Sequence, residues 1–386
     1  MKTRLPIILI VVSLLAAGCA KGPRPKAAEA PPVRGLSSYE RLEDALSRYR
    51  KIESQGGWIQ ISPGPKLQVG DRDERIILLR KRLAMTGDLK KAGNEDLFDE
   101  PLAEALRNFQ SRHGLEPDGA LGKETVAALN VPVEERIRQM EINLARLEGM
   151  SGLEKRRVEV NIADFRLKVM EGNASVLAMN VVVGQRREWQ TPLLNSKIEY
   201  LILNPKWHVP PDIFRKEVLA HIQKDVAYLT RQNMVVVDSN GSVDPTTIDW
   251  SQVDPKAPKY RIVQREGPGN SLGRIKFMFP NKYAVYLHDT PQKKLFARPM
   301  RALSHGCVRV ERPMDLAEYL MKENSEWTRE RIESAIRTGK NRTVELPASV
   351  PLHILYVTSW VDPDGTVQFR NDIYGLDRGM KQEIAF

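Results

Sequence analysis

One cysteine and two histidines lie close together in the C-terminal part of the chain, among residue types that suit nucleophilic chemistry. Cys307 stands in residues 304–309, whose sequence is Ser-His-Gly-Cys-Val-Arg, and His288 lies upstream in a Tyr-Leu-His-Asp stretch. A cysteine becomes an effective nucleophile when a base removes its proton and nearby donors stabilise the oxyanion that its attack creates. We therefore expect Cys307 to be a nucleophile and His288 to be its general base.

The polar, turn-like neighbourhood of Cys307 favours a reactive thiol over the buried structural role that free cysteines also take. Gly306 allows the backbone to approach a substrate closely and to direct amide N–H groups at an oxyanion. Arg309 adds a fixed positive charge with paired donors, which suits orientation of the loop or capture of a carboxylate. Together these residues predict nucleophilic catalysis through a covalent intermediate.

The N-terminus has the organisation of a secretion signal. Residues 1–4 carry two basic side chains, residues 5–17 form an apolar run, and Gly18 precedes Cys19. The apolar run is too short for an ordinary membrane-spanning helix. The sequence has two cysteines, and Cys19 lies at the cut site of the signal over residues 1–18, so Cys307 has no second cysteine in the folded body for an intramolecular disulfide.

The sequence around the cut site, Leu-Ala-Ala-Gly-Cys over residues 15–19, resembles a bacterial lipobox. The resemblance implies lipidation of Cys19, and several acyl chains give stable membrane anchoring. Ala20, in place of Asp, implies the periplasmic face of the outer membrane of a Gram-negative cell. The alternatives are an uncleaved anchor or a plain signal peptide in which Cys19 is incidental. The proline-rich residues 19–36 are predicted to form an extended tether.

The charge of the chain indicates an acidic partner. The sequence has 59 Lys and Arg against 49 Asp and Glu, a net charge of +10. This balance suits anionic lipid or a carboxylate-rich wall polymer. No recognition motif for nucleic acid is present, and the export signal also argues against a nucleic-acid partner.

Apolar residues at helical spacing organise the chain from residue 37 to residue 155. The spacing predicts scaffold helices in residues 37–66 and 132–155, with a compact three-helix unit in residues 67–131 between them. This unit resembles the small peptidoglycan-binding domain that accompanies many wall enzymes, although a plain helical spacer is the alternative. The matching residues are Phe109, Gln110, Gly114, Leu115, Asp118, Gly119, Gly122 and Thr125.

Strand patterns dominate after residue 156. Alternating or apolar runs predict strands at 157–162, 166–169, 177–184, 197–203, 274–279, 284–288 and 352–357. With helices expected at 314–321 and 327–337, residues 156–378 are predicted to form a β-rich α+β domain. A helical, polar, proline-rich insertion at 207–262 interrupts it, and such an insertion is either a substrate-capping lobe or a surface elaboration.

His288 combined with residues 304–309 resembles the motif of the YkuD-type L,D-transpeptidases. Residues 204–210 and 301–303 further resemble the large subgroup with a capping lobe and an inserted peptidoglycan-binding domain. The resemblance implies a β-rich catalytic domain with a helical capping insertion, a three-helix binding domain and scaffold helices. It also implies a cysteine acyltransferase that attacks a stem tetrapeptide, releases D-Ala and forms 3-3 cross-links in cell wall biogenesis.

The resemblance also implies roles for individual residues. Cys307 would be the nucleophile and His288 the base, oriented by a backbone carbonyl near Asp289. Amides around Gly306 and Cys307 would form the oxyanion hole, and His305 would shape the site. The substrate-binding residues would be Arg309, Ser304, Tyr286 and Trp207. The family implies peptidoglycan stem peptides and glycan as partners, carbapenems as inhibitors, and no metal or cofactor.

Several alternatives remain open at this point. A zinc site would use His288, Asp289, His305 and Cys307, but neither Cys-x-x-Cys nor His-x-x-x-His spacing supports it. A papain-like hydrolase would place its cysteine before its histidine, the reverse of the order here. The chain could also be a lipid-anchored wall-binding protein without activity, or an L,D-carboxypeptidase or hydrolase of the same family. The acceptor is open among a stem peptide, a lipoprotein lysine, a D-amino acid and water.

Overall fold

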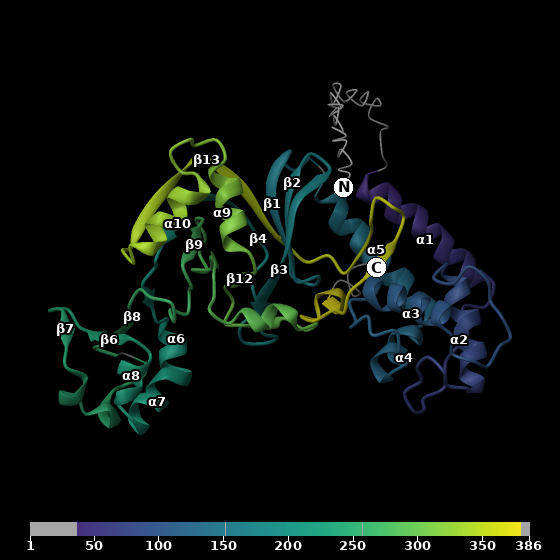
Figure 1. Cartoon of the computed structure of the whole chain (residues 1–386), viewed down its shortest axis with the longest axis horizontal. Helices are drawn as coiled ribbons and strands as arrows, with labels where there is room; N and C mark the ends of the chain where they lie inside the picture. The colour runs from purple at the N-terminus through teal and green to yellow at the C-terminus, as the bar shows by residue number, and fades with distance from the viewer. Residues whose placement is uncertain (1–36, 151, 257, 380–386) are drawn as a thin grey trace, which may run out of the picture. The chain divides into compact units, whose positions relative to one another are not determined.

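A computed structural model of the chain describes residues 37–150, 152–256 and 258–379 (Figure 1). The predicted signal peptide, the tether and Cys19 lie outside the described residues. Helices and strands are both present, and the C-terminal part is rich in strands, so the predicted α+β class is confirmed. Among the described helices, none combines the length and the apolar character needed to cross a bilayer.

Two long helices, α1 (Ser38–Ser54) and α5 (Val133–Glu148), pack against each other as their apolar spacing predicts. The start of α1 is capped reciprocally: the Ser37 hydroxyl accepts from the Glu40 N–H, and the Glu40 carboxylate accepts from the Ser37 N–H. The hydrophobic cluster that the two helices share also contains Trp58, Val361 and Phe369. Since Val361 and Phe369 come from the C-terminal part, the scaffold helices are packed against the far end of the sequence.

The compact unit between these helices contains α2 (Glu74–Met85), α3 (Glu100–Arg112) and α4 (Lys123–Leu129). The carboxylates of Asp73 and Asp99 accept hydrogen bonds from first-turn amides of α2 and α3, which explains where both helices begin. Its apolar side chains form a core of their own, which includes Ile76, Leu79, Leu83, Phe98, Leu102, Leu106 and Phe109.

A nine-stranded sheet organises the C-terminal part. In order of pairing its strands are β11 (Ala302–Ser304), β3 (Ala174–Gly184), β12 (Val308–Val310), β10 (Leu287–His288), β9 (Ile275–Met278), β4 (Leu194–Leu203), β13 (Arg342–Leu355), β1 (Arg156–Asn161) and β2 (Arg166–Glu171). Because β2 also pairs with β3, the sheet closes on itself. Most neighbours are antiparallel, but β3 with β11, β10 with β12, and β1 with β13 are parallel pairs. The crossover between β10 and β12 carries the 3-10 helix η4 (Lys293–Ala297).

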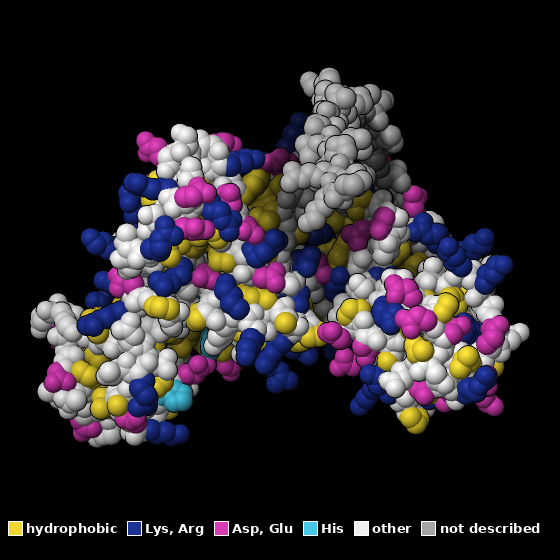
Figure 2. Space-filling model, in the orientation of Figure 1, with side chains coloured by type: hydrophobic (Ala, Val, Ile, Leu, Met, Phe, Trp, Pro, Cys, Tyr) yellow, Lys and Arg dark blue, Asp and Glu magenta, His cyan; other side chains and the backbone are white. Residues whose placement is uncertain are grey.

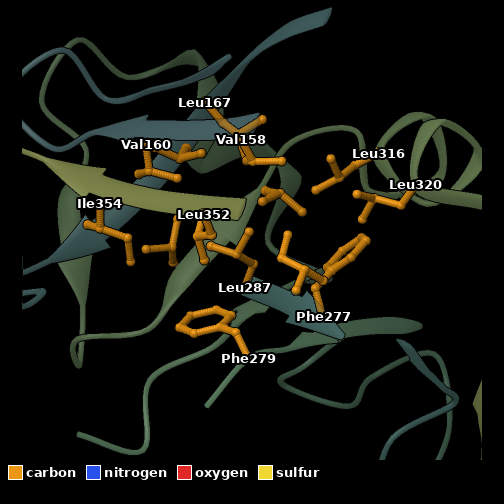
Figure 3. Packing of buried hydrophobic residues seen from close by; sticks show 14 of the residues in the cluster. Val158, Val160, Leu167, Phe277, Phe279, Leu287, Leu316, Leu320, Leu352 and Ile354 are labelled. Atoms are coloured by element: carbon orange, nitrogen blue, oxygen red, sulfur yellow. The ribbon is translucent and has the colours of Figure 1, made fainter. Parts of the chain in front are cut away.

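Alternate side chains of these strands fill one hydrophobic core (Figure 3). Phe277 of β9 and Leu287 of β10 meet Leu316 and Leu320 of α9 (Pro313–Met321) in this core. Burial of an apolar side chain of this size stabilises a fold by about 1.5–3 kcal/mol. Since successive residues of a strand point to opposite faces, the residues next to Phe277 and Leu287 face away from the core.

The insertion, residues 207–264, differs from the predicted helical lobe because it contains a second sheet. Its four antiparallel strands, in pairing order, are β5 (Trp207–His208), β8 (Arg261–Gln264), β6 (Met234–Val237) and β7 (Ser242–Val243). Its helices are α6 (Pro211–Ile213), the π-helix η1 (Phe214–Val218), α7 (Leu219–Lys224), α8 (Ala227–Arg231), η2 (Pro245–Thr247) and η3 (Trp250–Gln252). The β-branched run in β6 favours a strand, and it packs into a separate core with Phe214, Leu229 and Trp250.

Two strand boundaries and one hairpin also differ from the prediction. β13 begins at Arg342, well before the predicted strand at 352–357, and its register shifts between Glu345 and Val350, where the apolar alternation is interrupted. A hairpin of β14 (Ser359–Val361) and β15 (Val367–Phe369) follows it. The predicted strand at 284–288 shortens to β10, and α10 (Arg329–Arg337) lies within its predicted range.

The net positive charge is distributed rather than gathered in one place on the face seen in Figure 2. Basic and acidic side chains alternate over the described surface of that view. Among the described residues, acidic and basic side chains also pair, as Arg50 does with Glu141 and Arg329 with Glu318. Attraction to an acidic polymer would therefore act there as a diffuse long-range effect.

Candidate active site

Three charged or titratable side chains form a row across neighbouring strands, on the face of the sheet opposite the core. The register pairs Lys276 of β9 with His288 of β10, and His288 with Arg309 of β12. Their neighbours Phe277 and Leu287 are fully buried in the core. Because side chains alternate along each strand, the row points to the opposite face.

Cys307 lies beside this row. It precedes β12 and shares the face of Arg309, two residues further on. The Val308 N–H donates to the Tyr286 carbonyl over 3.1 Å, which fixes the register of the two segments. The Tyr286 side chain interacts with the Cys307 sulfur, since it acts to lower the pKa of the thiol while Cys307 acts to raise the pKa of Tyr286. Two segments separated in sequence thus place Cys307 and His288 on one face at neighbouring strand ends.

The turn before Cys307 is held in one conformation by its own residues. Gly306 has a φ of +108°, which an L side chain rarely adopts. The Ser304 hydroxyl donates to the Cys307 carbonyl over 2.6 Å and accepts from the Gly306 N–H over 3.2 Å, so it is used within the turn. Because the Gly306 N–H already has an acceptor, the Cys307 N–H is the better placed oxyanion donor; it has no hydrogen-bond partner among the described residues.

Thr191 fixes this turn from a neighbouring loop. Its buried hydroxyl donates to the Gly306 carbonyl over 2.8 Å and accepts from the Gly184 N–H over 2.8 Å. Tyr374 completes the network, because its hydroxyl donates to the Gly184 carbonyl over 2.6 Å and accepts from the Thr191 N–H over 3.2 Å. Sequence reasoning missed both residues, since neither lies near the motif or has a spacing that signals a role.

His288 is buried, and the backbone orients its ring. Its Nδ1 lies 2.5 Å from the carbonyl oxygen of Asp289. A carbonyl oxygen only accepts, so Nδ1 carries the proton and Nε2 keeps its lone pair. Burial, followed by the positive charge of Arg309, lowers the pKa of His288 to about 3. The resting imidazole is therefore neutral, which is the form that a general base requires.

The carboxylate of Asp289 braces the segment that contains this carbonyl. It accepts hydrogen bonds from the Arg274 N–H over 2.8 Å, from the Thr290 N–H over 2.7 Å and from the Lys293 ammonium over 2.6 Å. Gly273, with a φ of +62°, permits this packing, because a Cβ there would lie 2.3 Å from the Asp289 carboxylate. Asp289 therefore positions the ring of His288 through its main chain, while its side chain holds that main chain in place.

The electrostatic environment of Cys307 combines opposing effects. Burial raises the pKa of the Cys307 thiol above its ordinary value, whereas hydrogen bonding with Tyr286 and the positive charges of Lys276 and Arg309 act to lower it. Burial also raises the pKa of Tyr286 well above its ordinary value, so its hydroxyl remains a donor. The resting site therefore holds a thiol beside a neutral imidazole, with two cations close to both.

His305 connects the motif with the insertion. Its Nε2 lies 2.6 Å from the Glu217 carboxylate, which η1 supplies. The ring of Trp189 meets the His305 ring edge-on at 4.9 Å, and Lys216 pairs with Glu188 over 2.8 Å. π-Helices such as η1 are rare and often occur at functional sites. These contacts join the insertion to the turn that carries Cys307.

A groove of about 510 Å³ opens beside this turn. Its lining residues are Glu188, Trp189, Gln190, Thr191, Pro192, Leu193, Tyr283, Val285, His305, Gly306, Tyr374 and Leu376. Leu193 and Tyr283 give it exposed apolar walls, and Glu188 gives it a negative charge. A larger groove of about 660 Å³ lies within the insertion, but its lining contains no residue of the catalytic turn.

The structure gives other contacts to Trp207 and to the residues that were considered as zinc ligands. Trp207, expected to bind substrate, pairs with Gln264 in β5 and β8 and packs against the core of the insertion. The residues weighed as zinc ligands are engaged separately, since His305 contacts Glu217 and the Asp289 carboxylate contacts backbone amides and Lys293. Within the described ranges, no three His, Cys, Asp or Glu side chains are grouped to hold a metal ion.

Sequence comparisons relate two segments of the chain to known domain families. Residues 155–343 match the YkuD family profile, described as an L,D-transpeptidase catalytic domain, and residues 72–129 match a "Putative peptidoglycan binding domain". The chain is 37% identical over 220 residues to a protein of Haemophilus influenzae named "Putative L,D-transpeptidase". That alignment covers 57% of this chain and 44% of the relative, so the chain spans less than half of the relative's length.

Solved L,D-transpeptidases are also similar to parts of the chain. One from Stackebrandtia nassauensis is 14% identical and covers 76% of this chain and 97% of its own, with a TM-score of 0.28. One from Mycobacterium smegmatis is 13% identical and covers 52% of this chain and 58% of its own, with a TM-score of 0.22. The domain assignment rests on the sequence matches. The chain therefore contains a YkuD-type L,D-transpeptidase catalytic domain together with a domain of the peptidoglycan-binding family.

Proposed function

We propose that the chain is a peptidoglycan L,D-transpeptidase that forms 3-3 cross-links through a thioester on Cys307. The observation that carries this proposal is the placement of Cys307, Tyr286 and His288 on one face at the ends of β10 and β12, inside an L,D-transpeptidase domain. A nucleophile, a neutral base with a fixed tautomer and a free backbone N–H are the parts that acyl transfer requires.

In the first half-reaction, the proton of the Cys307 thiol moves to Nε2 of His288. The thiolate attacks the carbonyl carbon that precedes the terminal D-Ala of a stem tetrapeptide. The Cys307 N–H donates a hydrogen bond to the oxyanion and so stabilises the negative charge that develops on it. The C–N bond then breaks, D-Ala leaves with the proton from His288, and the acyl group remains on sulfur as a thioester.

In the second half-reaction, an acceptor amine attacks this thioester and His288 takes its proton. The new C–N bond forms the cross-link, and the sulfur leaves and recovers a proton. The groove beside Gly306 suits the acceptor, because Glu188 attracts a cationic side chain and Tyr283 offers an apolar wall. Arg309 suits a carboxylate of the donor stem, since its Nε is buried and has no partner among the described residues.

The direct test is incubation of the full-length chain with disaccharide-tetrapeptides, followed by mass spectrometry of the products. The proposal predicts release of D-Ala together with 3-3 cross-linked dimers. Tripeptide without dimers would indicate an L,D-carboxypeptidase, in which water attacks the thioester. An unchanged substrate would favour a wall-binding protein without activity and would contradict the proposal.

The insertion is proposed to act as a cap that excludes water from the thioester. Replacing Glu217 by glutamine removes the negative charge of the side chain that contacts His305. Because an exposed contact of this kind contributes about 0.2–1 kcal/mol, cross-linking should fall by about 1.4- to fivefold. The fraction of hydrolysed tripeptide should rise, while acylation of Cys307 by a carbapenem, which needs only the thiol and the oxyanion donor, should stay unchanged.

The matched control for this cap variant is Asp212→Asn. Asp212 pairs with Arg215 over 2.6 Å, and both residues belong to the insertion, so this ion pair does not reach the catalytic turn. The control should leave the ratio of cross-linked to hydrolysed product unchanged. If Glu217→Gln also leaves this ratio unchanged, the contact with His305 has no part in excluding water.

Lipid anchoring is proposed from the lipobox, and the binding domain would then hold the tethered enzyme against the wall. Replacing Cys19 by serine removes the thiol that would carry diacylglycerol. The expected result is an unlipidated chain that is retained with its signal or mislocalised. Membrane fractionation and intact mass measure this outcome. Unchanged fractionation and an unchanged lipid mass in the Cys19→Ser variant would refute lipidation at this residue.

A further inference from the structure

Lys276 is a half-buried cation beside the proposed nucleophile, and the family motif does not include it. It lies in β9, in register with His288, on the face that carries the catalytic residues. Its Nζ lies 3.8 Å from the centroid of the Tyr286 ring, a close cation–π contact. Among the described residues, its ammonium group has no hydrogen-bond or carboxylate partner.

The groups around Lys276 are neutral or positively charged. Tyr286 comes just before β10 and His288 lies in it, while Cys307 comes just before β12 and Arg309 lies in it. The other neighbouring strand, β4, places apolar Ile202 in register with Lys276. In the insertion, burial lowers the pKa of His208, and the positive charges of Arg261, Lys276 and Lys206 lower it further. Helix α9 packs on the opposite face through Leu316 and Leu320.

Two half-buried cations without carboxylate partners create a site that favours an anion. Like charges in a medium of reduced dielectric repel each other, and a negative charge placed near both is stabilised. The carboxylate of Asp289 is already paired with Lys293, so it does not neutralise the charges of Lys276 and Arg309. The sulfur of Cys307 is the group in this neighbourhood that can become negative.

His288 alone cannot supply the positive charge for a lasting thiolate. Once its ring accepts the thiol proton, it becomes a cation in register between Lys276 and Arg309, an arrangement that repulsion disfavours. The imidazolium is therefore short-lived and passes its proton to the leaving amine. A permanent cation that stays beside the sulfur throughout the reaction is the better counter-charge.

We propose that Lys276 is a positioning residue of the acyl-transfer reaction, which stabilises the Cys307 thiolate and, through the Tyr286 ring, holds the Tyr286 hydroxyl on the sulfur. This inference rests on the proposed role of Cys307 as nucleophile. With Lys276 included, residues from three adjacent strands, β9, β10 and β12, contribute to the site.

The test measures the thiol itself and requires no peptidoglycan substrate. The rate of Cys307 alkylation by iodoacetamide is followed against pH in the full-length chain, on the tryptic peptide that spans residues 302–309, so that Cys19 does not contribute. Lys276→Met should raise the pH midpoint by about one unit and slow alkylation near pH 7 about tenfold. Lys276→Arg should restore the rate, because it returns the charge to the same face.

The matched control is Lys282→Met. Lys282 is exposed and lies over the Tyr283 ring at 5.3 Å, so its variant removes a lysine–tyrosine contact outside the catalytic row. It should leave the alkylation midpoint unchanged. If Lys276→Met does not fold, Lys276→Gln takes its place with the same expected shift.

Two results would overturn the inference: an unchanged midpoint in the variant that lacks the charge, or a shift in Lys276→Arg as large as that in Lys276→Met. The outcome is separable from the proposed function. A shifted midpoint in a chain that forms no cross-links would support Lys276 while refuting transpeptidation. An unshifted midpoint in a chain that forms cross-links would refute the role of Lys276 while supporting transpeptidation.

Discussion

Cross-linking by a Cys307→Ala variant is expected to fall by about a thousandfold or more, because no other group in the site can form the acyl-enzyme. Ser304, the nearest hydroxyl in the motif, already bonds the Cys307 carbonyl and the Gly306 N–H. Without the sulfur, His288 has no nucleophile from which to take a proton. The measurement is the rate of D-Ala release and of dimer formation from disaccharide-tetrapeptides.

The control for this variant is Cys19→Ser, which removes the only other cysteine of the sequence. Assayed in detergent, it should keep the cross-linking rate of the parent chain. A carbapenem offers a second measurement, since intact mass should show one covalent adduct on the parent and none on Cys307→Ala. Robust dimer formation by Cys307→Ala, or a carbapenem adduct on it, would place the reactive group elsewhere.

Replacing His288 by glutamine is expected to lower the rate of thioester formation by about 10²- to 10⁴-fold, the usual contribution of a general base. Glutamine retains a donor for the Asp289 carbonyl but has no lone pair of suitable basicity to take the thiol proton. The loss should appear in the acylation step with the tetrapeptide. Stopped-flow or quenched-flow measurement of acyl-enzyme formation reports this step directly.

His353→Gln is the matched control, because it alters another buried histidine of the sheet. The His353 ring contacts Asn195 and Glu154, and its strand β13 pairs with β1 and β4 rather than with β10 or β12. This variant should acylate at the parent rate if it folds. Equal losses in both variants would mean that disturbed packing, rather than the missing base, accounts for the effect of His288→Gln.

Local sequence patterns predicted much of the fold. The helices α1 to α5 follow from apolar residues at helical spacing, a pattern that is read directly from neighbouring positions. Strands β1 to β4 and β9 follow from alternation, since each has one face in the core. The motif around Cys307 is similarly local, because the turn depends on Ser304 and Gly306, which lie within three residues of it.

Features that depend on tertiary contacts could not be predicted in this way. Lys276 enters the site only through the register of β9 with β10, and a single strand does not reveal its partners. Thr191 reaches Gly306 from another loop, and the carboxylate of Asp289 depends on the close approach of Gly273. The strand β6 is short and surrounded by polar and proline-rich sequence, so the second sheet of the insertion is apparent only once its pairing with β8 is seen.

The central claim, that Cys307 carries the acyl group between donor and acceptor, is tested most directly by trapping the thioester. The full-length chain is mixed briefly with disaccharide-tetrapeptide, quenched in acid and digested with pepsin for mass spectrometry. The account predicts an acyl-tripeptide adduct on the peptide that contains Cys307, which disappears as dimers form when an amine acceptor is added. An adduct on another residue, or dimers that form with no adduct on Cys307 at any time, would contradict it.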